Sequence, residues 1–463
     1  MLNMRSRTFL VRSAHSRLVL CVQCFAWAWL VGLPFILGCQ AQNTGGRTAV
    51  PQAAPAQEGG AATPGPAGAG KPRQESWQLV DVQGVRPPVG ASEQSVQSSG
   101  TAQLLSQGLD LARKGDVDKA IELFEEVLKR DPHNVVAGNN LAVCLKRRGQ
   151  LDEAIGEYEK LLTEQPMRAE LHNNLAAAYL AKGDFKKALE GFYQAIQLKS
   201  DYASAYYNLG HLLYLKADYP GAVNAYQQAL KLNPEQAIGH RDLGDSLRAM
   251  GKQDQALIEY HAAARLGDAS SALALRLSKA QRDTGQLAAA KQTLDRVLVR
   301  EPNNAEALDQ LGSVLFQLGK PDEAARVLEK ALDVDPRYAQ ARNDLGIVLY
   351  QRRRYADAIA VWKQALLIRP DYAETHYNMG NALFQAGLFE QAADAFRECL
   401  RYKRDDANAH NNLGLALMNL GKVDEAIQNW QQAIKLKPDL AQARLNLGRA
   451  LKKKQAAGKT SRS

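Results

Sequence analysis

The sequence predicts an all-α fold, a right-handed solenoid of ten tandem 34-residue helix-turn-helix units followed by one C-terminal capping helix. Two rows of residues carry this prediction. An alanine recurs every 34 residues from Ala120 to Ala426 without exception, and a proline recurs from Pro132 to Pro438 at intervals of 34 or 68 residues. A fixed period of about 20 to 50 residues indicates stacked units that cannot bury their apolar faces alone.

Each unit has the apolar pattern of two helices. In the tenth unit, residues 407–440, apolar residues recur at spacings of three and four, and Gly421 separates the two helices. Pro438 ends the second helix, because proline lacks the N–H that would continue it. A row of small residues from Gly108 to Gly414 lets the two helices of a unit approach each other.

This unit resembles the tetratricopeptide repeat, whose motif of small and large apolar residues the chain shows over residues 101–440 without an insertion. We number each unit from position 1 to position 34, so that position 1 of the first unit is residue 101. The resemblance implies that the first helix of each unit lines the concave side of the solenoid. We expect residues 441–455 to form the capping helix and residues 456–463 to form a basic tail.

The N-terminus has the composition of an export signal. Residues 1–39 contain four arginines and no acidic residue, and a long apolar run follows the arginines. The letters ILGC at residues 36–39 resemble the lipobox of bacterial lipoproteins, in which the cysteine is acylated and becomes the new N-terminus. The resemblance implies that residues 1–38 are a cleaved signal peptide and that lipid on Cys39 anchors the chain to a membrane. An uncleaved anchor is the alternative, since about 20 apolar residues can span a bilayer.

The residue after the cysteine indicates which membrane holds the lipid. In lipoproteins, an aspartate at this place commonly signals retention at the inner membrane, and this chain has Gln40. The resemblance therefore implies a lipid-anchored protein of the bacterial cell envelope, at the outer membrane and facing the periplasm.

Composition and charge distinguish the ends of the chain from its repeats. Residues 39–100 are rich in Gly, Pro, Ala and Gln, which predicts a disordered tether between the anchor and the units. Residues 101–448 carry 44 basic and 45 acidic residues, so the net charge of +9 belongs to the two ends. Repeats without a net positive charge predict no nucleic-acid partner.

The sequence offers no arrangement of residues for catalysis or metal binding, and we expect neither a metal nor another cofactor. Four histidines, His172, His240, His376 and His410, share position 4 of their units. Their separations are multiples of 34 residues, which is not metal-ligand spacing. We therefore expect a protein that is not an enzyme, with core or half-buried histidines at this position.

Position 6 of the first helices holds the main candidate binding residues, because it points away from the packed face of the helix. The candidate peptide-binding amides are Asn140, Asn174, Asn208, Asn378, Asn412 and Asn446. This row resembles the asparagine ladder of O-linked N-acetylglucosamine transferases, whose amides hold the backbone of an extended peptide. The resemblance covers the repeats of those enzymes and not their catalytic domain, so it implies only the peptide-holding role. The uninterrupted C-terminal run predicts a peptide along units 8 to 10. The alternative is that these amides bond locally within helix pairs.

A second row, at position 12, contains Phe316, Tyr350, Phe384 and Met418. We predict that Tyr350, Phe384 and Met418 form an apolar wall of the same groove. The alternative is that the row belongs to the core, as apolar stripes at helical spacing usually do.

These features predict a non-enzymatic adaptor or scaffold that holds extended peptide segments of other proteins in a concave groove during assembly of an envelope complex. The alternative is a structural subunit that uses its convex face or its ends and binds no free peptide. Chaperone-binding tetratricopeptide domains place lysine at position 5, where this chain has Asn343, Tyr377 and Asn411. Recognition of acidic chaperone tails is therefore not expected.

Overall fold

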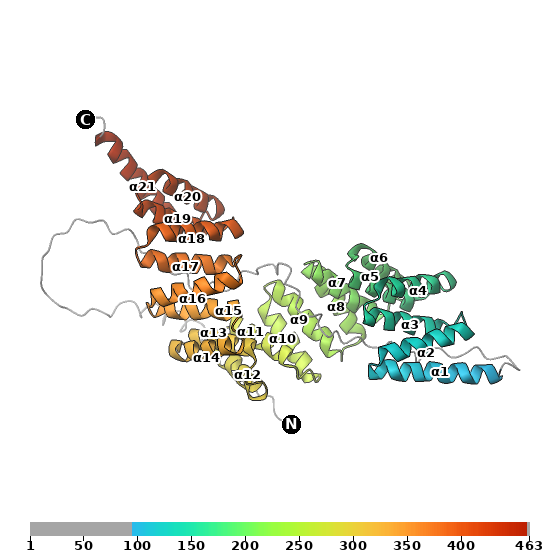
Figure 1. Ribbon diagram of the computed structural model, residues 1–463. Helices are drawn as coiled ribbons and strands as arrows, with labels where there is room; N and C mark the ends of the chain where they lie inside the picture. Colours follow the sequence, from blue (N-terminus) through green and yellow to red (C-terminus); the bar gives the residue numbers. More distant parts are fainter. Residues whose placement is uncertain (1–94, 461–463) are drawn as a thin grey trace, which may run out of the picture. The chain divides into compact units, whose positions relative to one another are not determined.

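The computed structural model describes residues 95–460, with side chains described for residues 100–455, and it confirms the all-α solenoid. The helices alternate between the first and the second helices of successive units (Figure 1). The first helices are α1 (Ser95–Lys114), α3 (Val135–Arg148), α5 (Ala169–Lys182), α7 (Ala203–Leu215), α9 (Ala237–Ala249), α11 (Ser271–Asp283), α13 (Ala305–Gln317), α15 (Ala339–Gln351), α17 (Ala373–Gln385), α19 (Ala407–Asn419) and α21 (Ala441–Thr460). The second helices are α2 (Val117–Arg130), α4 (Leu151–Glu164), α6 (Phe185–Leu198), α8 (Tyr219–Leu232), α10 (Gln253–Arg265), α12 (Leu287–Arg300), α14 (Pro321–Val334), α16 (Tyr355–Ile368), α18 (Phe389–Tyr402) and α20 (Val423–Leu436).

Each helix packs against the helix before it and the helix after it, so the units stack in sequence order. The first helices also pack against the first helix of the next unit. Among the described second helices the backbones do not come this close, although Arg397 of α18 and Glu425 of α20 form an ion pair over 3.6 Å. The first helices therefore form the more closely packed side of each local stack. We call the side of the first helices that faces away from their second helices the first-helix surface.

The two helices of a unit are joined by a large side chain that packs against a small residue. In the tenth unit, Trp430 of α20 is 2% exposed and lies against Gly414 of α19. A Cβ atom at Gly414 would stand 2.7 Å from Nε1 of Trp430, so a larger residue could not take this position without a shift. Gly244 and Tyr260 make the same contact in the fifth unit. The row of small residues therefore has the role that the sequence indicates.

The turn between the two helices of a unit needs a left-handed backbone at position 15. Gly149 supplies it with a φ of 88°, a conformation that costs glycine little. Ala217 and Arg353 adopt a φ of 60° at the same position, where a side chain is disfavoured. The side chain of Asp218 then caps α8 by accepting a hydrogen bond from the backbone N–H of Gly221.

The terminal helices are longer than the sequence predicts. α1 begins at Ser95 rather than at residue 101, and α21 continues to Thr460, beyond the expected end at residue 455. α21 packs on α20 and α19, as a capping helix would. Cys39, the predicted signal peptide and most of the predicted tether lie outside the described residues.

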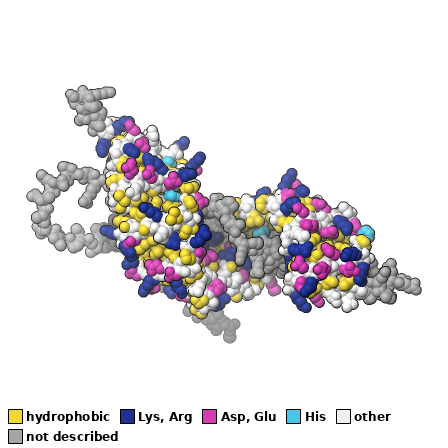
Figure 2. Space-filling model, viewed as in Figure 1, with side chains coloured by type: hydrophobic (Ala, Val, Ile, Leu, Met, Phe, Trp, Pro, Cys, Tyr) yellow, Lys and Arg dark blue, Asp and Glu magenta, His cyan; other side chains and the backbone are white. Residues whose placement is uncertain are grey.

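The described residues contain neither a helix suited to span a membrane nor a candidate metal cluster. None of the helices from α1 to α21 is both long and apolar enough to cross a bilayer. Over the same residues, no group of three or more His, Cys, Asp and Glu side chains is placed to hold a metal ion. Acidic and basic side chains are mixed over the face seen in Figure 2, in keeping with the balanced charge of the repeats.

The buried apolar residues fall into three clusters along the stack. The first extends from Ala112 to Ala225, the second from Ala222 to Ala280, and the third from Leu275 to Ala450. The second cluster is much the shortest, and it ends within α11. The boundaries between the clusters therefore fall in the fourth unit, on α8, and in the sixth unit, on α11.

Candidate peptide-binding surface

The asparagines near the N-terminus link neighbouring first helices. The Nδ2 atom of Asn174 donates a hydrogen bond to Oδ1 of Asn139 over 2.9 Å, and Nδ2 of Asn208 donates to Oδ1 of Asn173 over the same distance. In both cases a position-6 amide reaches back 35 residues to a position-5 amide of the preceding unit. Asn140 has Leu105 at the corresponding place and bonds instead to the Val136 carbonyl of its own helix.

The same linkage returns near the C-terminus. The Nδ2 atom of Asn446 donates to Oδ1 of Asn411 over 3.2 Å. Asn412 donates to the hydroxyl of Tyr377 over 3.1 Å and to Oδ1 of Asn381 over 2.8 Å. These first helices are thus joined by neutral amide groups that satisfy one another.

The candidate asparagines differ in how much surface they expose. Asn140, Asn174, Asn412 and Asn446 are buried, with exposures of 2 to 7%. Asn208 and Asn378 are half-buried. Asn378 has the weakest link of the row, at 3.5 Å from its Nδ2 to Oδ1 of Asn343. The amides therefore bond within the protein: five of the six bond to the preceding unit, and Asn140 bonds within its own helix.

These bonds leave part of the amide capacity unused. An asparagine side chain has two N–H donors and two acceptor lone pairs. Asn208 uses one donor for Asn173, and Asn378 uses one for Asn343. Because both side chains are half-buried, they present the remaining capacity at the surface of the stack.

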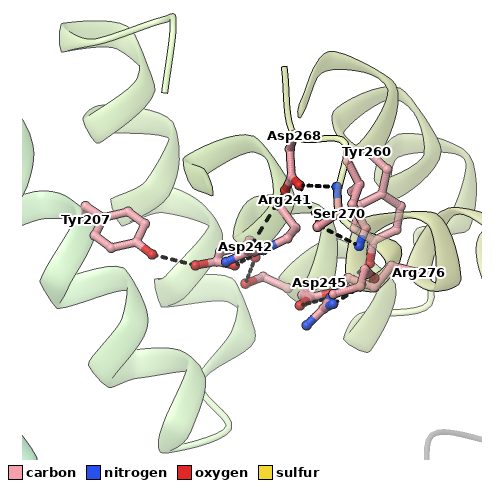
Figure 3. A network of polar contacts seen from close by, with 11 residues as sticks. Tyr207, Arg241, Asp242, Asp245, Tyr260, Asp268, Ser270 and Arg276 are labelled. Carbon is pink, nitrogen blue, oxygen red and sulfur yellow. Dashed lines mark hydrogen bonds and ion pairs between the residues drawn. The ribbon is translucent and has the colours of Figure 1, made fainter. Parts of the chain in front are cut away.

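Charged residues replace the amides between the fourth and the sixth units (Figure 3). Asp242 holds position 6 of the fifth unit and accepts a hydrogen bond from the hydroxyl of Tyr207 over 2.6 Å. Nε of Arg241 donates to the same carboxylate over 3.1 Å, and its guanidinium also lies 3.6 Å from Asp268. A tyrosine and an arginine thus take the place of the asparagines at position 5.

Arg276 stands at position 6 of the sixth unit, where the preceding position 5 is Arg241. Two arginines cannot bond to each other, and Arg276 instead donates from Nε to both oxygens of Asp245 over 2.9 and 3.1 Å. The hydroxyl of Tyr260 donates to the same carboxylate over 2.7 Å. Burial raises the pKa of Tyr260, so its hydroxyl keeps the proton it donates.

The seventh and eighth units bring two carboxyl groups together. Asp309 and Asp344 occupy the positions 5 and 6 that an asparagine pair fills elsewhere. Asp344 accepts hydrogen bonds from Ser313 and Asn343 over 3.0 and 3.1 Å. Asp309 is 5% exposed, and its Oδ1 atom is buried without a hydrogen-bond partner, while Oδ2 faces the Tyr338 hydroxyl at 3.4 Å. Burial, together with the neighbouring Asp344, raises the pKa of Asp309 to about 8.

Comparison with known proteins identifies the repeat. Profiles of the tetratricopeptide repeat match residues 111–179, 167–235, 207–271, 275–324, 310–373, 380–421 and 416–455. The chain belongs to the tetratricopeptide-repeat family. Proteins of this family bind other proteins or peptides and are generally not catalytic. No curated protein matches the chain.

Several solved tetratricopeptide structures resemble parts of it. YrrB, described as a TPR protein with an unusual peptide-binding site, is 25% identical over 41% of this chain and 97% of its own, with a TM-score of 0.34. The pilF protein of Pseudomonas aeruginosa is 19% identical over 46% of this chain and 96% of its own, with a TM-score of 0.42. Yeast Tom70 is 16% identical over 78% of this chain and 89% of its own, with a TM-score of 0.42.

The aromatic row at position 12 packs inside its tetratricopeptide units. The ring of Tyr350 lies 5.3 Å from that of Tyr355 and 6.2 Å from that of Trp362, and both partners belong to the second helix. Phe384 is 9% exposed and its ring lies 5.2 Å from that of Phe389. Phe316 and Met418 are partly buried against the same core. These contacts favour the core interpretation of the row.

Three of the four histidines at position 4 of the tetratricopeptide units bond to a proline carbonyl that was not predicted from the sequence, whereas His410 bonds to Asn429. Nε2 of His172 donates to the carbonyl oxygen of Pro166 over 2.7 Å, and His376 bonds to Pro370 in the same way over 2.9 Å. His240 makes the same contact with Pro234 near the end of the preceding unit, over 3.1 Å. The signal was available, because each of these three histidines follows a proline of the periodic row by six residues.

Proposed function

We propose that this chain is a non-enzymatic adaptor that holds extended segments of other proteins along its first-helix surface. The observation that supports the proposal is the pair of amide rows, one in units 2 to 4 and one in units 9 to 11. Each row presents amide groups at intervals of one unit, and its half-buried members retain donors and acceptors. An amide can donate to a carbonyl and accept from an N–H, so it binds a peptide backbone without selecting side chains.

The six asparagines contribute unequally to this proposed site. Asn208 and Asn378 are the best placed to meet a peptide, because both are half-buried, and Asn378 has the weakest hydrogen bond of the row. Asn174, Asn412 and Asn446 act mainly by holding the first helices in register, whereas Asn140 bonds within its own helix. Tyr350, Phe384 and Met418 support the surface from within the core rather than as a wall of the groove.

A photo-crosslinking amino acid tests where the partner lies. Placed at position 378, it should capture partner proteins from the native membrane. The matched control places the same group at Lys330, which is exposed on the second helix α14. Capture from position 378 and little from position 330 is expected. Equal capture, or capture from position 330 alone, would favour the structural subunit instead.

One observation favours that second candidate. Val299 of α12 and Leu367 of α16 are 81% and 84% exposed, and Ile258 of α10 is 62% exposed. All three lie on second helices, where large apolar side chains in water are available for contact with another protein. A structural subunit would use this side of the stack and would tolerate changes at Asn208 and Asn378.

The anchoring part of the proposal rests on the sequence around Cys39. A lipid on this cysteine would hold the tetratricopeptide units at the periplasmic face of the outer membrane during assembly of an envelope complex. Changing Cys39 to Ala should leave an unprocessed precursor that incorporates no labelled fatty acid in the native bacterium. Equal mass and equal labelling of the variant and the wild type would exclude a lipoprotein.

A further inference from the structure

The second helices of the sixth, seventh and eighth units, α12, α14 and α16, follow one another along the stack (Figure 1). Position 29 holds Val299 in α12 and Leu367 in α16, and these side chains are 81% and 84% exposed. Every other unit has a polar residue at this position. Position 18 of the same two helices holds Ala288 and Ala356, both exposed, whereas six of the other eight units have Asp or Glu there. The outward stripe of α12 and of α16 therefore has an uncharged residue at each end.

Positions 18, 22, 25 and 29 lie on one face of a helix, because they are separated by four, three and four residues. This spacing is the same in both directions along the helix. When two identical helices lie antiparallel with their midpoints together, position 18 of each meets position 29 of the other, and position 22 meets position 25. A two-fold axis that runs across the second helices would bring each helix against its own copy in this way.

Side-chain size is complementary under this pairing. Ala356 would face Leu367 of a second copy, and Ala288 would face Val299 of that copy. A small residue opposite a large one lets two helices approach closely, and the large side chain is then removed from water. The middle pairs, Ala360 with Lys363 and Gln292 with Asp295, bring no like charges together.

Charge is complementary on α14, which lies between these two helices. Arg326 stands at position 22 and Glu329 at position 25, and both are exposed. Neither makes a hydrogen bond or an ion pair with the residues that the structure describes. In the antiparallel pairing each would meet the opposite charge of the second copy. Asp322 and Asp333 would also face each other, but Asp322 is already paired with Arg352 over 2.8 Å, which reduces the repulsion.

We propose that the outer faces of α12, α14 and α16 bind the same faces of a second copy of this chain, with each helix antiparallel to its own copy. Three neighbouring helices are needed, because a specific interface buries about 800 Å² per partner, more than one helix face provides. The first-helix surface stays free in such a dimer, so this inference goes beyond the proposed peptide binding and does not depend on it. A crosslink from position 330 of α14 would then join two copies, and its mass distinguishes them from another protein.

Paired cysteines test the antiparallel arrangement in the full chain, extracted from the membrane into a large excess of detergent micelles. The variant combines Ala356→Cys with Leu367→Cys and is treated with a short bismaleimide; the native Cys144 and Cys399 are buried. It should form crosslinked dimers. Each single variant should form few, because equal positions of the two helices would lie about 16 Å apart along their axes, at about 1.5 Å per residue. The matched control, Asp118→Cys with Lys129→Cys at the equivalent positions of α2, should form few as well.

A charge exchange tests α14, with the dissociation constant of the dimer measured by sedimentation equilibrium in the same detergent. Glu329→Arg would place two arginines together twice in each dimer, so the dissociation constant should rise at least about tenfold, or about 1.4 kcal/mol. Adding Arg326→Glu should restore most of the affinity. The matched control, Glu125→Arg, makes the same exchange at position 25 of α2 and should leave the dimer unchanged. Circular dichroism should give equal melting temperatures for all variants, since these side chains are exposed.

Three outcomes would overturn the proposal. A chain that sediments as a monomer at every concentration would show that this face binds no second copy. A dimer that Glu329→Arg leaves intact, or that crosslinks equally well through Leu367→Cys alone, would have a different interface. Crosslinking of the double variant in the native membrane to another protein, with no dimer of the chain, would assign the face to that protein. The first two outcomes leave the proposed peptide binding standing, because it uses the first helices.

Discussion

The interface between the second and third units and the interface between the seventh and eighth units place side chains at the same two repeat positions. The residues at these positions differ between the two interfaces. In the first, Asn174 donates to Asn139, and both amides are neutral and paired. In the second, Asp309 and Asp344 stand at the equivalent positions, close enough for Asp344 to raise the pKa of Asp309, and one carboxyl oxygen of Asp309 has no hydrogen-bond partner. The comparison shows that the repeat specifies where two side chains meet but not what they do there. Amides join the helices at any pH, whereas the acids depend on a proton.

The charged interfaces lie near the part of the stack where apolar packing is interrupted. The second apolar cluster ends at Ala280 and the third begins at Leu275, both on α11, which also carries Arg276 and Lys279. Polar groups between first helices therefore matter most in the middle of the chain. Three substitutions test this difference between neutral and charged interfaces, in decreasing order of expected effect.

The largest effect is expected from Arg276→Asn, which restores the usual residue of position 6 but leaves Asp245 without its arginine. Asp245 is 6% exposed, and removal of one partner from a buried ion pair costs about 3 kcal/mol or more. Urea unfolding, with hydrogen exchange to locate the change, measures it. Adding Asp245→Asn should recover most of the loss. If the single variant is as stable as the wild type, the ion pair does not hold this interface.

A gain in stability is expected from Asp309→Asn. The unfolded chain ionises this carboxyl around pH 3.8, whereas the folded chain keeps the proton up to about pH 8. The folded state therefore binds more protons between these values, and the stability of the wild type falls as the pH rises through that range. Each unit of raised pKa corresponds to about 1.4 kcal/mol, so the variant should gain at least about 2 kcal/mol at pH 8.

Unfolding in urea at pH 5 and at pH 8 measures this gain. The difference between the wild type and Asp309→Asn should be larger at pH 8 than at pH 5. Asp333→Asn, which changes an exposed acid on α14, is the matched control and should show no such trend. A constant difference between the two pH values would mean that the proton on Asp309 does not limit the stability of this interface.

The smallest effect is expected from the reverse exchange, Asn174→Asp. The new carboxylate would face Oδ1 of Asn139, so two acceptors would meet in a site where Asn174 is 7% exposed. An unsatisfied buried acceptor costs about 1 to 3 kcal/mol, and the loss should shrink as the pH falls and the carboxyl regains a donor proton. Hydrogen exchange of the amides in α3 and α5 shows where the stability is lost. Equal protection in both proteins at pH 8 would contradict the role given to the amide pair.

The sequence predicted much of the fold because the repeat motif is local. The small residues such as Gly414, their large partners such as Trp430, and the ends of the helices all follow from the 34-residue period. The row of position-6 asparagines was also visible. Their partners were not, because a bond from Asn174 back to Asn139 depends on how far one unit is offset from the next.

The same limit applies to the acids and the aromatic row. Asp309 and Asp344 lie on different helices, and their meeting follows from the stacking of units rather than from either helix alone. The burial of the position-12 side chains was harder still to predict, because the direction of Tyr350 and Phe384 depends on the tilt between the two helices of a unit. Helical periodicity places a residue on a face but does not decide whether a neighbouring helix covers that face.

The sparse contact between the described second helices has a mechanical consequence. Bending that spreads the second helices apart separates no packed backbones and breaks only exposed side-chain contacts such as the ion pair between Arg397 and Glu425. Bending in the opposite sense pulls the first helices apart and must break bonds such as the one from Asn446 to Asn411. The stack should therefore bend more easily around a segment that lies on the first helices than in the opposite direction.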